Sequence, residues 1–473
     1  MISNQLVCAA VGAVLAFAGF AGYPPALITS VGDTSVRPLS VTQSQPRLRV
    51  ATDRKEPGGY PVLYTYNSLL QIAPDTAAML VTRNVYTPWG QVDFEDGSDI
   101  FVFRSLDELP EARPITCTRS GIVKDADFSG ADRYHVNYGM FGGFVPHGAK
   151  LDGKPHPHAG TGFGTCAITS HPVATNGLFS WQMPGHVARR LEIFDFSYDG
   201  KIFSAKLDAS LGEGDPLPIG QTDWTFVRSG LGNAIPDGAD LLLPSIAAKR
   251  GSAESPCGLV RWRRTNGKWR PVDFQQIADS GKYRGEPSVV RLSKTVLLFC
   301  VRDDRKRQKE HPNWTYGNQQ DLDVWLSEDN GRTWTKRVEV ADVRMGPVTV
   351  GRTCGGSVFL VSNPGYPEPV LEKRRNLLTL WPLSENLDAL GPAQVIRNAK
   401  DLESGCGFWQ FDHPVSSIIR LADGKLHSFL SYRVRDHWWD PKTKEPIATP
   451  SADAGAAIQE VTGPGEDIPV WEF

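Results

Sequence analysis

The chain has 473 residues, with 50 Lys and Arg against 53 Asp and Glu, which leaves a formal net charge of −3. This balance argues against a protein whose main role is to bind nucleic acid or anionic lipid, because such binding requires an excess of cations. Hydrophobic residues make up 40% of the chain, which excludes a disordered protein, while 46 Gly and 35 Pro exclude a helical bundle and favour many short strands.

The N-terminal segment resembles a secretory signal. Residues 6–20 are apolar and uncharged, the small residues Ala21 and Gly22 follow, and the first charged residue is Asp33. The apolar run is short for a membrane span, and no later stretch is apolar enough to cross a bilayer. We therefore expect a signal peptide at 1–22, a linker at 23–46, and a secreted protein (extracellular or periplasmic) that does not contact the membrane after cleavage.

Strand-like segments separated by Gly or Asx turns occupy the rest of the chain, for example at 77–86, 288–302, 348–362 and 422–435. No composition shift divides this region. We predict a single catalytic domain over 47–473.

A stretch rich in histidine and glycine lies between residues 133 and 164. It contains His135, His147, His156 and His158 beside Tyr134, Asn137 and Tyr138. Imidazole exchanges protons near neutral pH, so this density indicates a site. The other interpretation is that residues 155–158 form an exposed turn and that His135 is a hydrogen-bonded strand residue. Two His at positions i and i+2 without a nearby third ligand are not a metal signature, so we predict no metal ligands here.

The octapeptide 327–334, SEDNGRTW, predicts a hairpin. Asn330 and Gly331 can supply the positive φ angles of a tight turn, and the side chain of Asp329 can bond backbone groups within it. The pattern resembles the Asp-box, or BNR repeat, of sialidases and related β-propellers, in which it lies on the outer rim and has no catalytic role. We therefore assign Asp329 to structure.

Weaker copies of this pattern begin near Ser197, Arg264 and Ser384, which with Ser327 gives spacings of 67, 63 and 57 residues. Repeats of this length suit four-stranded blades with long loops. The 427 residues of 47–473 divide into about 61 per blade for seven blades and about 71 for six. The resemblance thus implies an all-β fold, a β-propeller of four-stranded blades, with seven blades favoured over six.

A second resemblance concerns the segments HVNYG and HPHAGTGF. They look like the paired-histidine region of secreted propeller polysaccharide lyases, the ulvan lyases and the fungal rhamnose–glucuronate lyases, which are seven-bladed. The resemblance implies that His135 and His158 are the two catalytic His and that Arg261 is the catalytic Arg. The family's Tyr lies sixteen residues before that Arg, and this chain has Ser245 there. The usual phenolic base is absent in this register.

The lyase interpretation fits these residue types. β-Elimination from a uronic acid needs a cation against the carboxylate, which Arg261 would supply, and proton exchange, which His135 and His158 would perform. Other residues near predicted inner strands are candidates for substrate binding: Tyr134, Asn137, Tyr138, His156, Arg284, Glu286, Arg302, Arg352 and His413.

We expect a monomeric polysaccharide lyase that cleaves a uronic-acid-containing glycan, with an anionic polysaccharide or oligosaccharide as its partner. We expect no required cofactor, and the channel has room for a structural Ca²⁺ or Zn²⁺ ion. One alternative is an exo-glycosidase of the sialidase or glucuronidase type, with Tyr432 as nucleophile and nearby arginines on the substrate carboxylate. The other is a non-catalytic secreted sugar-binding propeller, which the missing Tyr supports.

Overall fold

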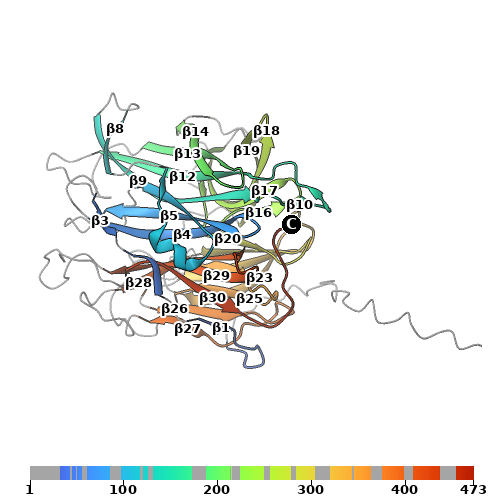
Figure 1. Ribbon diagram of the computed structural model, residues 1–473. Coiled ribbons are helices and arrows are strands. Elements are labelled where there is room, and N and C mark those ends of the chain that lie inside the picture. Colours follow the sequence, from blue (N-terminus) through green and yellow to red (C-terminus); the bar gives the residue numbers. More distant parts are fainter. Residues whose placement is uncertain are drawn as a thin grey trace, which may run out of the picture.

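The computed structural model describes residues 32–42, 45–49, 51–55, 61–85, 97–117, 121–125, 131–172, 188–212, 215, 224–249, 256–278, 284–303, 320–343, 346–363, 375, 377–398, 409–436 and 454–473. Within these ranges the chain is built from β-strands, with one 3₁₀ helix, η1 (Leu106–Glu111). Six main sheets follow one another around a common axis (Figure 1). This confirms the predicted all-β propeller.

The first three sheets are blades I to III. Blade I contains β3 (Ala51–Lys55), β4 (Pro61–Ala73), β5 (Thr76–Val85), β6 (Gly97–Phe103) and β7 (Ile115–Thr116). Blade II contains β8 (Gly121–Asp125), β9 (Ala131–Val145), β12 (Thr161–Pro172), β13 (Ala188–Tyr198) and β14 (Phe203–Gly212). Blade III contains β15 (Trp224–Ser229), β16 (Ile235–Asp237), β17 (Asp240–Lys249), β18 (Cys257–Thr265) and β19 (Lys268–Ala278).

The remaining sheets are blades IV to VI. Blade IV contains β20 (Arg284–Arg291), β21 (Leu297–Asp303), β22 (Gln320–Ser327) and β23 (Thr335–Val343). Blade V contains β24 (Thr349–Arg352), β25 (Val358–Ser362), β26 (Leu377–Pro382) and β27 (Gln394–Asn398). Blade VI contains β28 (Trp409–Arg420), β29 (Leu426–Asp436), β30 (Gly455–Thr462), β1 (Ser40–Val41) and β2 (Gln45–Arg49). A separate hairpin joins β10 (Lys150–Leu151) to β11 (Lys154–Pro155).

The prediction of seven blades is wrong, because the sheets number six. The four sequence marks were correctly placed in equivalent hairpins, since each lies near the turn between the third and fourth strands of blades II to V. The error came from extrapolating their spacing to the whole chain. Arg104, in the equivalent connection of blade I, is 93 residues before Ser197, because β4, β9 and β12 are long and the β10–β11 hairpin is inserted.

Blade VI is closed by strands from both ends of the chain. Ser40 pairs with Thr462 and Gln45 pairs with Ile458, so β1 and β2 both lie against β30. The propeller therefore begins before residue 47 and includes part of the segment that we assigned to a linker at 23–46. The predicted signal peptide at 1–22 lies outside the described residues.

The hydrophobic core is divided among the interfaces between neighbouring blades. Six clusters of buried side chains occupy the six interfaces, including the one between blades VI and I. Between blades II and III, for example, the rings of Phe163 and Trp262 stack with centroids 3.9 Å apart. Each blade is buried on both faces, which explains why many strands are apolar runs and do not alternate.

The hairpin predicted from SEDNGRTW connects β22 to β23 on the outer side of blade IV. The Asp329 carboxylate accepts hydrogen bonds from Ser327 Oγ and from the backbone nitrogens of Arg332 and Thr333, at 2.8–2.9 Å. Although burial acts in the opposite direction, these bonds lower the pKa of Asp329 to about 2. The carboxylate is used within the turn, as expected for a structural residue.

Two further observations limit the interpretation. In the described part of the chain, no helix has the length and apolar character needed to cross a bilayer. Five cysteines lie in the described ranges, and all five are free thiols: Cys117, Cys166, Cys257, Cys300 and Cys354.

Candidate functional site

Charged side chains from several blades meet at one end of the central channel, where the innermost strands begin. The innermost strands of neighbouring blades contact each other, as in β28 with β4 and β20 with β24. We call this end the mouth. The groups that meet there form the mouth cluster, which consists of Tyr66, Glu286, Arg302, Arg375, Asp412, His413 and Arg433.

Irregular backbone positions two members of the cluster. Glu286 has φ of 55° and His413 has φ of 53°, values in the left-handed region that few non-glycine residues adopt. Each lies at a shift of register near the start of its strand, in β20 and β28. Such bulges redirect side chains, and strained residues of this kind cluster at functional sites.

Asp412 forms the buried electrostatic centre of the cluster. Its carboxylate is fully buried and accepts two hydrogen bonds from Arg433, from Nε at 2.6 Å and from Nη2 at 2.7 Å. Arg375 donates a third bond to the same carboxylate. Burial alone would raise the pKa of Asp412, but the two arginines and His413 hold it well below its usual range. Asp412 is therefore an ionised anchor for the arginines.

His413 links two carboxylates from blades IV and VI. Its Nδ1 lies 3.0 Å from Asp412 Oδ1 and its Nε2 lies 3.4 Å from Glu286 Oε1. Blade V lies between these two blades in the chain, so the contact crosses the mouth of the channel. Burial lowers the pKa of His413 although both carboxylates oppose this shift. The imidazole is thus neutral at pH 7 and has a single N–H to donate.

Glu286 is the more accessible carboxylate, with 20% of its side chain exposed. Arg302 Nε lies 3.1 Å from Glu286 Oε2. Burial alone would raise the pKa of Glu286, but Arg302, His413 and Arg375 together lower it strongly. The group is a carboxylate at neutral pH and can accept a proton only when its surroundings change.

Tyr66 brings a phenol to the same place from blade I. It is half-buried on β4, at a shift of register between Tyr64 and Asn67. Its ring meets that of His413 edge to face, with centroids 3.9 Å apart, and the guanidinium carbon of Arg433 lies 4.5 Å from the ring centre. The cation above the ring favours electron density on the phenol.

The structure brings together three of the residues singled out from the sequence: Glu286, Arg302 and His413. It does not bring together the three predicted catalytic residues. His135 pairs with Ser170 along β9 and β12, whereas His158 accepts hydrogen bonds from Thr161 at the opposite end of β12. Nine residues separate Ser170 from Thr161, which corresponds to about 30 Å along a strand.

His158 and Arg261 do share the end of the channel away from the mouth. Arg261 Nη1 lies 2.6 Å from Asp237 and 3.2 Å from Asp240, so its charge is already paired. Burial is the main cause of the lowered pKa of both His156 and His158. This pair therefore lacks a partner at the mouth with which to complete the predicted elimination site.

The other predicted substrate-binding residues are dispersed. Arg352 lines a cavity at the far end of the channel. Asn137 is buried, where it donates to Ser98 Oγ and accepts from the nitrogen of Gly139. Tyr134 and Tyr138 lie on β9 and Arg284 lies on β20, but their side chains are outside the described part of the structure.

Two other expectations concern residues away from the mouth surface. Ser245 is fully buried and donates to the carbonyl of Leu243, as a structural residue would. Tyr432, considered as a sialidase-type nucleophile, has no exposed surface and belongs to the core between blades V and VI.

Sequence reasoning missed Tyr66, Arg375 and Asp412. An aspartate between Phe411 and His413 in an otherwise apolar strand was the available signal for Asp412, because a buried charge requires a partner. Nothing in the sequence indicated that β4 would place Tyr66 beside it.

No group of three or more His, Cys, Asp or Glu side chains suited to a metal ion occurs among the described residues. The mouth cluster itself offers two carboxylates, but arginines occupy both. A structural Ca²⁺ or Zn²⁺ in the channel therefore has no candidate ligand set within those ranges.

Comparison with known proteins gives only structural likeness. The chain matches no protein-family model and no curated protein sequence. A protein of unknown function from Dyadobacter fermentans is 13% identical, with a TM-score of 0.51 over 89% of this chain and 98% of that chain. It supports the fold alone.

Two enzymes are also among the similar structures. Trypanosoma rangeli sialidase in complex with sialic acid is 12% identical with a TM-score of 0.47, over 92% of this chain and 59% of that chain. Penicillium chrysogenum α-L-arabinanase complexed with arabinobiose is 11% identical with a TM-score of 0.44, over 89% of this chain and 98% of that chain.

Proposed function

We propose that the protein is a carbohydrate-active enzyme, a glycoside hydrolase that removes a terminal sugar bearing a carboxylate, with the mouth cluster as its active site. The observation that carries this proposal is the meeting of Tyr66 and Glu286 on the imidazole of His413, beside three arginines. Groups from distant parts of the sequence converge there on strained backbone, as in sites built for chemistry.

The charge of the cluster favours an anionic substrate. Three arginines face two ionised carboxylates, and His413 is neutral, so the described groups carry one net positive charge. Arg302 Nη1 is buried and has no hydrogen-bond partner among the described residues. A guanidinium with a donor in this state suits a substrate carboxylate, which it can bind through paired hydrogen bonds.

The residue types suit attack by a phenol. Asp412 is committed to two arginines, so the described cluster lacks the two independent carboxyl groups of most glycosidases. A tyrosine nucleophile is the documented exception. In this scheme Tyr66 attacks the anomeric carbon, Glu286 takes the phenol proton, the leaving sugar departs, and water then hydrolyses the glycosyl–tyrosine bond.

β-Elimination on a uronic acid is the rival within the same site. Tyr66, His413 and Arg302 supply a phenol, a neutral imidazole and a cation, which are the groups that an elimination needs. The two reactions differ in product, because elimination leaves a conjugated double bond that absorbs ultraviolet light and hydrolysis does not.

The test uses 4-methylumbelliferyl glycosides of N-acetylneuraminic acid, glucuronic acid and, as a neutral control, arabinofuranose, together with the polymer ulvan. Released fluorophore or new reducing ends without a gain in ultraviolet absorbance support the proposal. New reducing ends with matching absorbance would replace it with the lyase, and binding without turnover would replace it with a sugar-binding propeller.

Variants locate the activity. We expect Tyr66→Phe to lower kcat by about 10²-fold or more, because the attacking oxygen is lost, and Glu286→Gln to lower it similarly. Tyr198→Phe and Glu385→Gln are matched controls away from the mouth and retain full activity. Full activity in Tyr66→Phe would exclude the proposed mechanism.

A further inference from the structure

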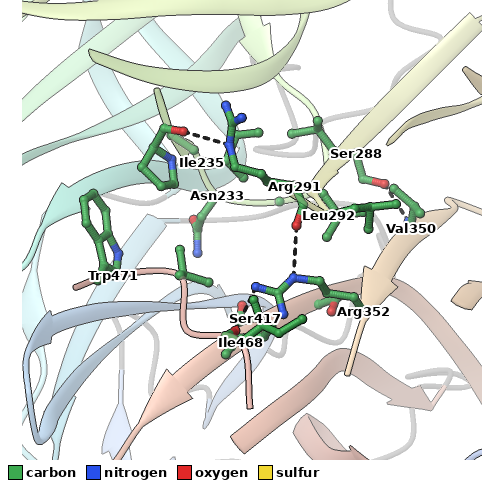
Figure 2. Close-up of a pocket in the computed structure, with 18 of the residues that line it drawn as sticks. Asn233, Ile235, Ser288, Arg291, Leu292, Val350, Arg352, Ser417, Ile468 and Trp471 are labelled. Carbon is green, nitrogen blue, oxygen red and sulfur yellow. Dashed lines mark hydrogen bonds between the residues drawn. The ribbon is translucent and has the colours of Figure 1, made fainter. Parts of the chain in front are cut away.

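A cavity of about 880 Å³ occupies the channel at the end away from the mouth (Figure 2). Strands of several blades line it, and residues 468–471 of the C-terminal segment form part of its wall. Ser288, which lines the cavity, follows Glu286 by two residues on β20, so the cavity begins just below the mouth cluster. Its size is that of a site for a small organic ligand.

Most of the cavity wall is apolar. Side chains from blades I, II, III, IV and VI and from the C-terminal segment contribute, among them Leu69, Phe144, Leu231, Val289, Ile418 and Trp471. An apolar space of this size gains little from water, because each buried water molecule needs two to four polar partners.

Several polar side chains in the wall are already used by the protein. Asn233 accepts from Ser68 Oγ and donates to the carbonyl of Leu69, which ties blade III to blade I. Arg291 donates to the carbonyls of Pro236 and Lys294, and Asp237 Oδ1 lies 3.5 Å from its guanidinium. These groups hold the blades together and leave the cavity apolar.

Arg352 is different because its charge has no counterion. It is 4% exposed, and its guanidinium donates to the carbonyls of Arg291, Thr353 and Ile468 at 3.0–3.3 Å. These bonds use three of the five N–H donors of an arginine. No carboxylate among the described residues forms an ion pair with it. A buried cation without an anion is costly, and burial lowers its pKa to about 10.

An unused hydroxyl lies in the same part of the cavity. Ser417 Oγ is buried without a hydrogen-bond partner among the described residues. Figure 2 shows Arg352, Ser417 and Ile468 close together, below the apolar space between Trp471 and Leu292. One end of the cavity thus offers a cation and a hydroxyl, and the rest offers hydrocarbon.

We propose that this cavity is a second binding site, for an apolar monocarboxylate of the fatty-acid class. The carboxylate accepts hydrogen bonds from Arg352 and Ser417, and the hydrocarbon chain fills the apolar part of the channel. The site is separate from the mouth cluster and does not depend on the function proposed for it.

The test measures binding of cis-parinaric acid to the full-length protein by fluorescence, followed by displacement with decanoate, decanol or acetate. We expect saturable binding, displacement by decanoate, at least about tenfold weaker displacement by decanol, and none by acetate, because both the charge and the chain contribute. Absence of saturable binding, or equal displacement by decanoate and decanol, would overturn the proposal.

Variants separate the two parts of the site. Arg352→Met should weaken decanoate by about tenfold and leave decanol nearly unchanged. Ile418→Trp should block the probe by filling the apolar part, while Ile202→Trp, at a position 70% exposed on blade II, should not. If Arg352→Met fails to fold, lowering the pH through the pKa of decanoic acid on the wild type replaces it. Decanoate should then lose its advantage over decanol, and a constant advantage would contradict the role of Arg352.

Discussion

Asp412→Asn tests whether the mouth cluster depends on one buried charge. The substitution keeps the size of the side chain but removes the anion that faces Arg433 and Arg375. In the Asp412–Arg433 pair the side chains are 0% and 1% exposed, so solvent cannot replace the lost partner. Breaking a buried pair of this kind costs about 3–5 kcal/mol, a large part of a typical free energy of unfolding.

The matched control is Asp75→Asn. Asp75 also pairs with an arginine, Arg104, but these side chains are 43% and 57% exposed. A pair so open to solvent contributes less than about 1 kcal/mol. Unfolding in urea, followed by tryptophan fluorescence, gives the free energies of unfolding of both variants and the wild type.

A double-mutant cycle identifies the cause. In an Arg433→Met background, Asp412→Asn should cost less than in the wild type by about 1–3 kcal/mol, because one stranded cation is already gone. If Asp412→Asn costs no more than Asp75→Asn, or if its cost is the same in both backgrounds, the buried charge is not what stabilises this end of the channel.

Three further variants test the site and the rim. The pKa of Glu286 is lowered in the folded state, so its stabilising contribution is present above the unfolded value of about 4.3 and is lost as the pH falls below it; the stability gap between wild type and Glu286→Gln, measured in urea, should narrow below about pH 4 and not at pH 6. The pKa of His413 is also lowered, so the wild type should lose stability as the pH falls below about 6.5, and His413→Gln should lose less; identical pH profiles would show that the imidazole titrates normally. Asp329→Ala should lower the free energy of unfolding by about 1–2 kcal/mol through the lost turn bonds and leave glycosidase activity intact; a loss of activity in the folded variant would contradict a purely structural role.

Local signals in the sequence predicted local structure well. The turn at 327–334 carries its own hydrogen-bonding groups, so the residues alone specified the hairpin around Asp329. The repeat marks fell in equivalent hairpins for the same reason. The number of blades depends on strand length and on insertions such as the β10–β11 hairpin, which the turn motifs do not record.

The candidate site was predictable only in pieces. Glu286, Arg302 and His413 stood out as charged residues beside strand-like runs, but their meeting depends on bulges that set φ near 55° and 53° at Glu286 and His413. His135 and His158 looked like a pair because they are 23 residues apart, yet β9 carries the chain along the channel between them. Sequence distance is a poor guide to spatial distance where a long strand intervenes.

The pairing of β1 and β2 with β30 makes assembly of the ring depend on the order of synthesis. Residues 40–49 leave the ribosome early, but their partners at 455–462 are among the last to be made. Until then blade VI lacks its outer strands, and the two unpaired edges are exposed to other chains. Joining segments more than 400 residues apart also carries a large loop-closure entropy, which slows folding. A chain that stops short of residue 455 would leave the translation machinery as an open ring, prone to aggregation.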